Sequence, residues 1–287
     1  MGEIYIDPQI KQKIIDEYNK GMSVLGLTKV FPYSYGVIYR VLKENNIIIR
    51  YISFTARKYH CNSNIFHVID TQEKAYWLGF LYADGYISQI NNSYIVGLSL
   101  SSVDKTHVEK FRSFLETDYP INEYISSGFK ASLYSRIAVN DKIIAEDLIR
   151  HGVVLQKTNV LKFPQLSNEL IPHFIRGYFD GDGCLTCHKR RKGSEDLVWV
   201  IKFCGTKDML ENIYNNLPKR YNKPINLYQR YNRDNNNYCF DIGGNIQVVH
   251  ILNYLYKDAT IYLERKYQKY RQALLTPLRR IKKYEIQ

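Results

Sequence analysis

Apolar residues recur along this chain with two periods, one typical of helices and one typical of strands. Residues 7–48 carry them three or four positions apart, in short runs separated by Gly21 and by Phe31-Pro32-Tyr33. This pattern predicts three short helices. From residue 71 onward, helical runs alternate with paired segments in which apolar and polar residues alternate singly, as in half-buried strands.

The order helix, strand, strand, helix, strand, strand, helix is predicted twice, in residues 71–163 and again in 164–287. The elements expected in the first copy are helix 73–84, strands 86–90 and 94–101, helix 104–115, strands 121–126 and 131–139, and helix 141–150. Those expected in the second are helix 169–182, strands 184–190 and 197–204, helix 207–216, strands 225–231 and 238–242, and helices 246–256 and 260–275. The sequence therefore predicts an α+β fold of two tandem units, preceded by a small all-α domain (1–50) and a basic, aromatic linker (51–70).

Each copy begins with an apolar helix that carries small residues four positions apart. These are Gly79 and Ala83 in the first copy, and Gly177 and Gly181 in the second. Residues four apart share one face of a helix. A glycine in the middle of a helix costs about 1 kcal/mol relative to alanine, whereas small residues let two helix backbones approach closely. The repeat therefore predicts that the two helices pack on each other, although two separate buried helices of an ordinary core are the plainer interpretation.

Both helices end in Asp-Gly, at Asp84-Gly85 and at Asp182-Gly183, and the two aspartates are 182 − 84 = 98 positions apart. The glycines are expected in the left-handed conformation that closes many helices. Parallel packing would bring the aspartates side by side, where they repel unless a cation lies between them. Mg²⁺ needs only one or two carboxylates together with phosphate and water, so the pattern predicts a site for Mg²⁺ or Mn²⁺.

These stretches resemble the signature helices of the LAGLIDADG homing endonucleases. Residues 175–183 are very close to the family pattern, and residues 77–85 match it more loosely, with Tyr82 where the pattern has an acid. The resemblance implies a saddle-shaped pseudo-dimer that cuts both strands of a long DNA target, with Asp84 and Asp182 as catalytic acids. Asp180 has no acidic counterpart in the first copy and is interpreted as local polar support.

The resemblance also implies a role for one lysine in each copy. Lys157 and Lys266 occupy equivalent places in the repeat, where the family carries a basic residue near the scissile phosphate. Carried over, they would polarise water or stabilise the pentavalent phosphate, while the metal activates water and stabilises the leaving 3′ oxygen.

The net charge of +12 and the pI of about 9.3 indicate a polyanionic partner. Strand alternation places residues such as Leu133, Ile137 and Val139 on the apolar face. The opposite faces are basic and polar, which suits a DNA major groove, although a solvated face would show the same alternation. The expected DNA-contacting residues of the strands are Ser88, Tyr134, Arg136, Thr186, His188, Lys202, Tyr228 and Arg230.

The three N-terminal helices resemble the helix-turn-helix of resolvase-like DNA-binding domains. The last helix of such a motif enters the major groove. By position, Ser34, Tyr35, Tyr39 and Arg40 would then face DNA. A small helical packing domain is the alternative.

Together these features predict a monomeric, metal-dependent, site-specific endonuclease that acts on double-stranded DNA. The alternatives are an intron maturase that binds RNA and a non-enzymatic transcription regulator. Five scattered cysteines argue against a secreted disulfide framework, and no apolar run reaches the ~18 residues of a membrane span. We therefore expect a soluble intracellular protein, in a bacterial or phage-infected cytoplasm or in an organelle, that is not secreted.

Overall fold

The computed structural model describes residues 6–49, 59–91, 93–127, 131–154, 160–193, 195–220, 224–229 and 236–277. The chain divides into two compact units, Met1–His60 and Cys61–Gln287. Each unit has its own hydrophobic core. None of the helices in the described part of the chain combines the length and apolarity needed to cross a lipid bilayer.

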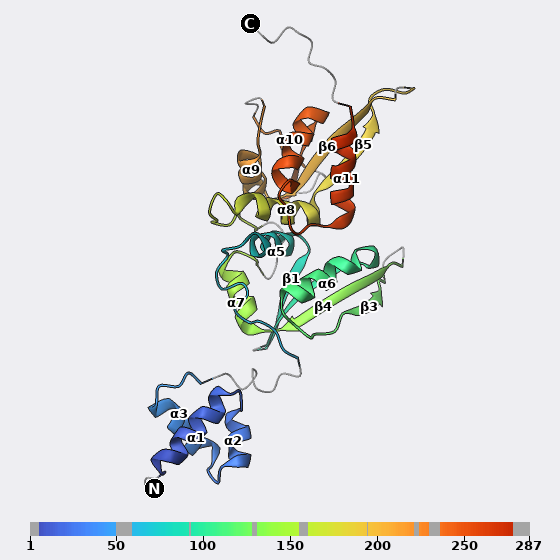
Figure 1. Cartoon of the computed structure of the whole chain (residues 1–287). Coiled ribbons are helices and arrows are strands. Elements are labelled where there is room, and N and C mark those ends of the chain that lie inside the picture. The colour runs from blue at the N-terminus through green and yellow to red at the C-terminus, as the bar shows by residue number, and fades with distance from the viewer. Residues whose placement is uncertain are drawn as a thin grey trace. The chain divides into compact units, whose positions relative to one another are not determined.

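The first unit contains the expected helices α1 (Pro8–Asn19), α2 (Val24–Val30) and α3 (Tyr35–Glu44) (Figure 1). Their first turns follow capping residues: Asp7 accepts a hydrogen bond from the backbone of Gln9, and Ser23 accepts one from Gly26. The apolar faces meet in a core that includes the fully buried side chains of Ile14, Leu27, Ile38 and Leu42.

The second unit contains two halves with the same order of elements. The first half comprises α5 (Gln72–Ala83), β1 (Gly85–Ile90), β2 (Ser93–Ser101), η1 (Ser102–Asp104), α6 (Lys105–Phe114), β3 (Asn122–Ile125), β4 (Leu133–Asn140) and α7 (Lys142–Arg150). The second comprises α8 (Ile171–Asp182), β5 (Cys184–Lys189), β6 (Leu197–Gly205), α9 (Lys207–Asn216), β7 (Tyr228–Gln229), β8 (Tyr238–Gly243), α10 (Asn245–Tyr256) and α11 (Glu264–Leu275).

The two antiparallel sheets share one topology. Their strand orders are β1-β2-β4-β3 and β5-β6-β8-β7, so the second hairpin of each half pairs with the first through its last strand. In each half the first two strands form an antiparallel hairpin: Tyr86 of β1 pairs with Gly97 of β2, and Cys184 of β5 pairs with Lys202 of β6. The expected α+β fold of two tandem units is confirmed.

Helices α5 and α8 lie between the two halves of the second unit (Figure 1). The buried apolar residues of both halves form a single cluster around them, which includes Trp77, Phe111, Phe174 and Ile251. One face of each helix contacts the other helix. The remaining faces contribute to the buried cluster that both halves share. The pair is thus the centre of the fold and fixes one half against the other.

The cysteines differ in part from the expectation. Cys204 of β6 and Cys239 of β8 are register partners and form a disulfide, while Cys61, Cys184 and Cys187 carry thiols outside any disulfide of the described residues. A single cross-strand pair within one sheet does not staple distant parts of the chain in the way a secreted disulfide framework does.

Candidate functional site

The small residues of α5 and α8 form the contact between the two helices. A Cβ atom on Gly79 would overlap the carbonyl oxygen of Phe174, and one on Gly177 would overlap the carbonyl oxygen of Tyr76. Backbone therefore meets backbone across this face. This is the close approach that small residues four positions apart predict.

The two helices run in the same direction, so their C-terminal ends meet. One turn beyond the contacts just named, Gly181 lies against Ala83, and a Cβ there would be 3.1 Å from Oδ2 of Asp84. Asp182 is the next residue of that chain. The side chain of Asp84 is half-buried and that of Asp182 is exposed, so both carboxylates emerge at one edge of the helix pair.

The glycines that follow the aspartates are not left-handed, and that expectation was wrong. Gly183 is extended, with φ −74° and ψ 162°, and Gly85 already begins β1. Space is what requires glycine here: a Cβ on Gly183 would overlap the ring of Phe179, and one on Gly85 would lie 2.8 Å from Cα of Leu81. In each half the backbone passes directly from the helix into the strand, and the aspartate lies at that junction.

Lys266, in the first turn of α11, reaches the end of α8. Its side chain is only 3% exposed. The ammonium donates to the carbonyl oxygens of Phe179, Asp180 (2.8 Å) and Gly183 (2.6 Å), and lies 3.4 Å from that of Gly181. These are carbonyls of the last helical turn and just beyond it; that of Phe179 also accepts from the backbone N–H of Gly183, while carbonyls at a helix end otherwise lack a partner within the helix.

The charges of both aspartates act on this lysine. Burial lowers the pKa of Lys266 to about 8, and the negative charges of Asp180, Asp84 and Asp182 oppose that shift. The carboxylates of Asp84 and Asp182 thus lie near enough to the ammonium of Lys266 to interact with it electrostatically. The equivalent lysine of the first half, Lys157, lies outside the described residues.

Asp180 is fully buried between the two halves of the second unit. Its carboxylate accepts hydrogen bonds from the hydroxyl of Tyr76 on α5 (2.8 Å), the hydroxyl of Tyr256 on α10 and the backbone of Leu263 (2.8 Å). Burial raises the pKa of Asp180, while Lys266 and these hydrogen bonds oppose the rise. The contacts agree with its interpretation as polar support and direct it away from the exposed edge.

A buried histidine extends this arrangement into the first half. Nε2 of His107 lies 2.9 Å from the hydroxyl of Tyr76. Because Tyr76 donates its one proton to Asp180, His107 must donate from Nε2, which leaves Nδ1 as an acceptor without a partner among the described residues. Burial lowers the pKa of His107 to about 3, so the ring is neutral. The hydrogen-bonded series His107, Tyr76 and Asp180 thus links the two halves.

The sequence did not reveal this network. Its one signal was that Asp180 has Tyr82 as its counterpart in the first half. Tyr82 donates instead to the carbonyl oxygen of His151 within its own half, at 2.6 Å. The two motifs therefore differ at this position: in the second, Asp180 is hydrogen-bonded to the other half, whereas in the first, Tyr82 is hydrogen-bonded to the residue that ends α7 in its own half.

The open face of the first sheet carries an aromatic and polar row. The guanidinium of Arg136 lies 5.3 Å from the centre of the Tyr86 ring, and Tyr134 stacks on Tyr124 with ring centres 5.7 Å apart. Ser88 is half-buried on the same face of β1. The structure thus brings Ser88, Tyr134 and Arg136 onto one surface of the sheet.

The apolar face of this sheet ends earlier than expected. Leu133 was assigned to it but is 45% exposed, and its register partner Ile125 is 68% exposed. The core begins at Ser135 and continues through Ile137, both of which are fully buried. The expectation for Leu133 was wrong because the buried stretch of β4 begins only at Ser135.

The open face of the second sheet carries a cluster of charged and polar side chains. It carries the expected residues Thr186, His188, Lys202 and Tyr228. The ammonium of Lys202 lies 3.5 Å from the carboxylate of Asp241, which also accepts a hydrogen bond from Tyr228 at 2.7 Å. Asp241 was not singled out from the sequence. Arg230 lies outside the described residues.

In the first unit, the residues expected to face DNA lie on α3. Ser34, Tyr35 and Arg40 are exposed, while Tyr39 is half-buried against the core of the unit. The rings of Tyr35 and Tyr39 stack with centres 6.2 Å apart. Ser34 stands at the cap position of α3, but its hydroxyl makes no capping hydrogen bond.

This arrangement has counterparts among solved structures. The LAGLIDADG homing endonuclease I-SmaMI bound to cleaved DNA is 12% identical; the match covers 72% of this chain and 88% of that one, with a TM-score of 0.48. The LAGLIDADG homing endonuclease I-LtrWI bound to target DNA is also 12% identical; the match covers 75% of this chain and 90% of that one, with a TM-score of 0.47. The LAGLIDADG meganuclease I-AabMI bound to uncleaved DNA is similar too (14%, 70% and 88%, 0.45). At these identities and TM-scores the similarity assigns no activity or partner to this chain.

Comparisons of sequence add little to this. No family model matches the chain. A probable translation initiation factor IF-2 of Methanocaldococcus jannaschii is 27% identical over 160 residues, which is 52% of this chain and 13% of that protein. The chain thus spans about an eighth of the length of that relative, and the match carries no function over to it.

The oxygen atoms at the paired helix ends suit a hard divalent cation. The carboxylates of Asp84 and Asp182 stand at the C-terminal ends of α5 and α8, where the helix dipoles are negative. Among the described residues, no group of three or more His, Cys, Asp or Glu side chains is arranged to hold a metal. A Mg²⁺ or Mn²⁺ ion shared with a phosphate needs no such group, because one or two carboxylates are sufficient.

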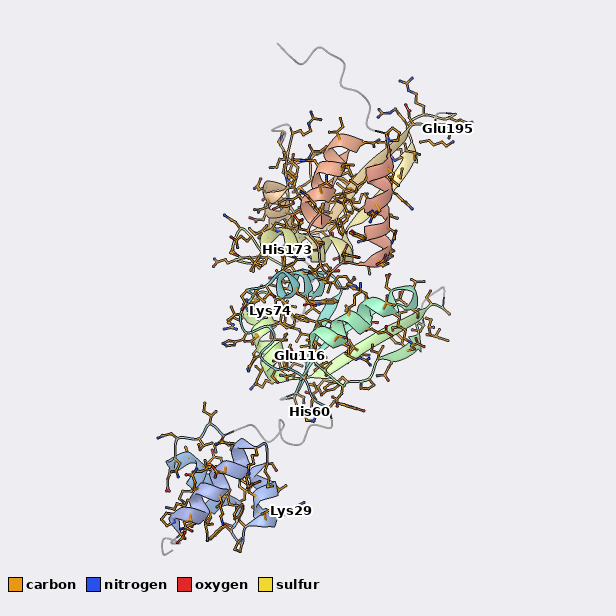
Figure 2. All side chains as sticks on the ribbon, in the orientation of Figure 1. Lys29, His60, Lys74, Glu116, His173 and Glu195 are labelled. Carbon is orange, nitrogen blue, oxygen red and sulfur yellow. A yellow bond between two sulfur atoms is a disulfide. The ribbon has the colours of Figure 1, made fainter. Side chains whose placement is uncertain are left out.

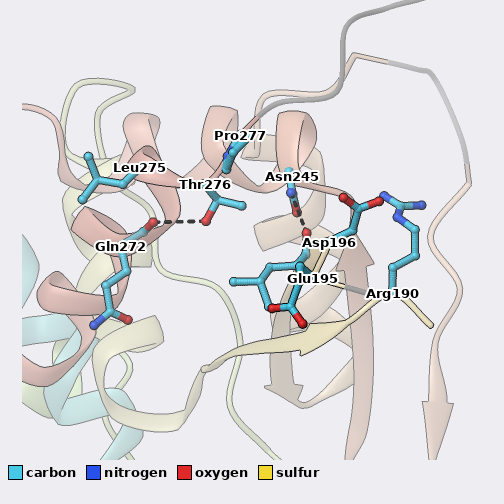
Figure 3. A pocket seen from close by; sticks show the side chains of 9 residues that line it. Arg190, Glu195, Asp196, Asn245, Gln272, Leu275, Thr276 and Pro277 are labelled. Atoms are coloured by element: carbon cyan, nitrogen blue, oxygen red, sulfur yellow. Dashed lines mark hydrogen bonds between the residues drawn. The ribbon is translucent and has the colours of Figure 1, made fainter. Parts of the chain in front are cut away.

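Other hollows of the second unit lie apart from these residues. Lys74 and His173, labelled in Figure 2, lie in the first turns of α5 and α8. Each lines a hollow whose lining includes neither Asp84 nor Asp182. A cleft of about 300 Å³ opens between the end of α11 and the hairpin of β5 and β6 (Figure 3). Its lining consists of Arg190, Glu195, Asp196, Leu197, Asn245, Gln272, Leu275, Thr276 and Pro277. None of the residues singled out from the sequence lines it.

Proposed function

We propose that this protein is a LAGLIDADG-type endonuclease that cuts both strands of double-stranded DNA at a specific site. The observation that carries the proposal is the meeting of two motif helices, backbone to backbone, with Asp84 and Asp182 emerging at the shared end. Phosphodiester hydrolysis at two nearby phosphates needs one acid group for each strand on a rigid support. The helix pair supplies that support.

In this proposal the two aspartates hold the divalent metal, Mg²⁺ or Mn²⁺. When bound, such an ion supplies Lewis-acid stabilisation of the phosphate oxygens and activation of water. The carboxylates orient it, and the tight contact between α5 and α8 sets the spacing between the two carboxylates. Lys266 contributes a fixed positive charge beside them.

The two open sheet faces are proposed to contact the DNA on either side of the cut. Arg136 and Lys202 would bind phosphates or the acceptor atoms of guanine, and Asp241 could accept from the cytosine amino group. The tyrosines would contribute apolar contact and hydroxyl hydrogen bonds. Because the two faces differ in composition, the target is expected to be long and asymmetric.

The first unit is proposed to extend recognition as a helix-turn-helix. Tyr35 and Arg40 on α3 are exposed, which supports a role for them in reading the groove as in such motifs. Because one chain carries this unit and both sheet faces, a single chain is sufficient to read the site, so the active species is expected to be a monomer.

The proposal is tested by exposing a randomised duplex DNA library to the full-length protein and sequencing the cut ends. Reactions contain Mg²⁺ or Ca²⁺, and parallel reactions use Asp84→Asn and Asp182→Asn variants. Paired cuts on both strands at one long motif, in Mg²⁺ and with the wild-type chain, are expected.

Other outcomes would assign the chain to another class. Selective DNA binding without cutting in Mg²⁺ would contradict the enzymatic proposal and indicate a transcription regulator. Neither cutting nor selective binding to DNA, together with binding to a structured intron RNA, would indicate a maturase.

A further inference from the structure

The ammonium of Lys266 has all its donors engaged. A protonated lysine has three N–H donors and no acceptor. The carbonyl oxygens of Phe179, Asp180 and Gly183 take up these donors, and the remaining carbonyl, of Gly181, lies farther away at 3.4 Å. Because the side chain is 3% exposed, no N–H remains for a phosphate oxygen, and a protonated amine has no lone pair for water.

The carbonyls that bind Lys266 lie on both sides of Asp182 in the chain. Helix α8 ends at Asp182, and Gly183 leads directly into β5. Many helices satisfy their last carbonyls with a left-handed residue, which α8 lacks because Gly183 is extended. The backbone makes one closing hydrogen bond, from the N–H of Gly183 to the carbonyl of Phe179. The ammonium supplies the remaining closure and holds the backbone before and after the aspartate.

We propose that Lys266 is a positioning residue, which fixes the end of α8 so that Asp182 presents its carboxylate to the metal, and that it does not contact the phosphate or the attacking water. This inference rests on the proposed endonuclease function. It differs from the role that sequence resemblance implies for this lysine. By comparison with residues that orient metal ligands from behind, its loss is expected to weaken metal affinity about 10-fold.

The test compares Lys266→Met, Lys266→Arg and Lys269→Met in the full-length chain. Lys269 is a matched control, because it lies one turn later on α11 and donates to a single carbonyl, that of Leu185 at 2.9 Å. Calorimetric titration of Ca²⁺ into each protein–DNA complex gives the metal affinity without cleavage. The Mg²⁺ dependence of the cleavage rate is measured in parallel.

We expect the Lys266→Met complex to bind Ca²⁺ about 10-fold more weakly and to need correspondingly more Mg²⁺, with most of the rate restored at saturating Mg²⁺. Lys269→Met should match the wild type. Wild-type metal dependence with a rate that stays low at saturating Mg²⁺ would overturn the inference, because it indicates a contact with the reacting phosphate. If Lys266→Met does not fold, Lys266→Arg provides the same comparison, since arginine keeps the charge but not the compact geometry.

An independent readout is the ammonium signal of Lys266 in an NMR spectrum of protein labelled with ¹⁵N-lysine. A slowly exchanging ammonium, absent in Lys266→Arg and retained in Lys269→Met, is expected to keep its position when duplex DNA and Ca²⁺ are added. A large shift on adding DNA would contradict the inference. If the wild type neither cuts nor selects DNA, the proposed function fails, and this spectrum still shows whether the ammonium caps α8.

Discussion

At the scale of single residues, the centre of the second unit depends on a few buried polar groups. Asp180 binds hydroxyl groups from both halves, and Lys266 binds carbonyls of residues that follow Asp180 in the chain. Burying an ionised group is costly unless it is paired and hydrogen-bonded. Removing one member therefore leaves an uncompensated group, which makes each of these residues sensitive to substitution.

Replacing Asp180 with Asn should destabilise the fold by about 3 kcal/mol, because it removes the negative charge that faces buried Lys266. Tyr82→Phe is the matched control from the first motif, where a single hydrogen bond to His151 is lost, at a cost of about 1 kcal/mol. Urea denaturation measures both. Equal losses in the two variants would show that Asp180 is not coupled to a buried charge.

The neutral, buried His107 predicts a pH dependence of stability. Burial lowers the pKa of His107 from 6.5 to about 3 in the folded state. Below pH 6.5 the unfolded chain therefore takes up a proton that the folded chain does not, and stability falls as the pH decreases. At pH 5 the loss from this group is roughly 2 kcal/mol.

His107→Gln should remove this contribution, because the amide can still donate to Tyr76 but does not titrate. The comparison requires chemical denaturation of both proteins at pH 7 and pH 5. If both proteins lose the same stability between these pH values, the titration of His107 does not contribute.

At the scale of elements, α5 and α8 show what could be predicted from the sequence and what could not. Small residues four apart predicted their packing, because this spacing is local and its steric meaning is general. The conformation of Gly183 was mispredicted, because the ring of Phe179, not backbone preference, excludes a side chain there. The burial of Lys266 could not be predicted either, since its acceptors are 83 to 87 residues away in the chain.

Gly177→Ala should separate these helices, because the new methyl group overlaps the carbonyl oxygen of Tyr76. We expect a loss of stability of about 1 to 3 kcal/mol and a fall in cleavage of about 100-fold, since the two aspartates would no longer be aligned. Gly36→Ala in α3 is the control, because no atom lies within 4 Å of the added methyl group. Thermal denaturation and cleavage rates check both, and a fully active Gly177→Ala variant would contradict the packing described here.

At the scale of the whole molecule, one chain contains two open sheet faces of different composition and a separate helical unit. The halves of the second unit are further joined on the side of α6, where Arg265 binds the carboxylate of Asp104 at 2.9 Å and Lys110 donates to the carbonyl of Tyr262 at 3.4 Å. The fold class and the repeat were evident from the sequence. The difference between the two sheet faces was not, because it depends on cross-strand partners such as Asp241 and Tyr228.

Arg136→Ala should weaken binding to the specific DNA target by about 1 to 3 kcal/mol and relax selectivity at one position of the site. Lys142→Ala is the control, because it removes one positive charge from the same half but lies on α7, where Lys142 pairs with Glu146 at 3.5 Å. Binding is measured by fluorescence anisotropy at several salt concentrations. Equal weakening in both variants would indicate that only net charge matters.

The proposed function requires that Asp84 and Asp182 form one hydrolytic site at the end of the helix pair. The most direct test is cleavage of an end-labelled duplex carrying the selected target, by the wild type and by Asp84→Asn and Asp182→Asn, in Mg²⁺. We predict that the wild type cuts both strands and that each variant binds the duplex with wild-type affinity but fails to make the double-strand cut. Full double-strand cutting by either variant would contradict a shared site of the two aspartates.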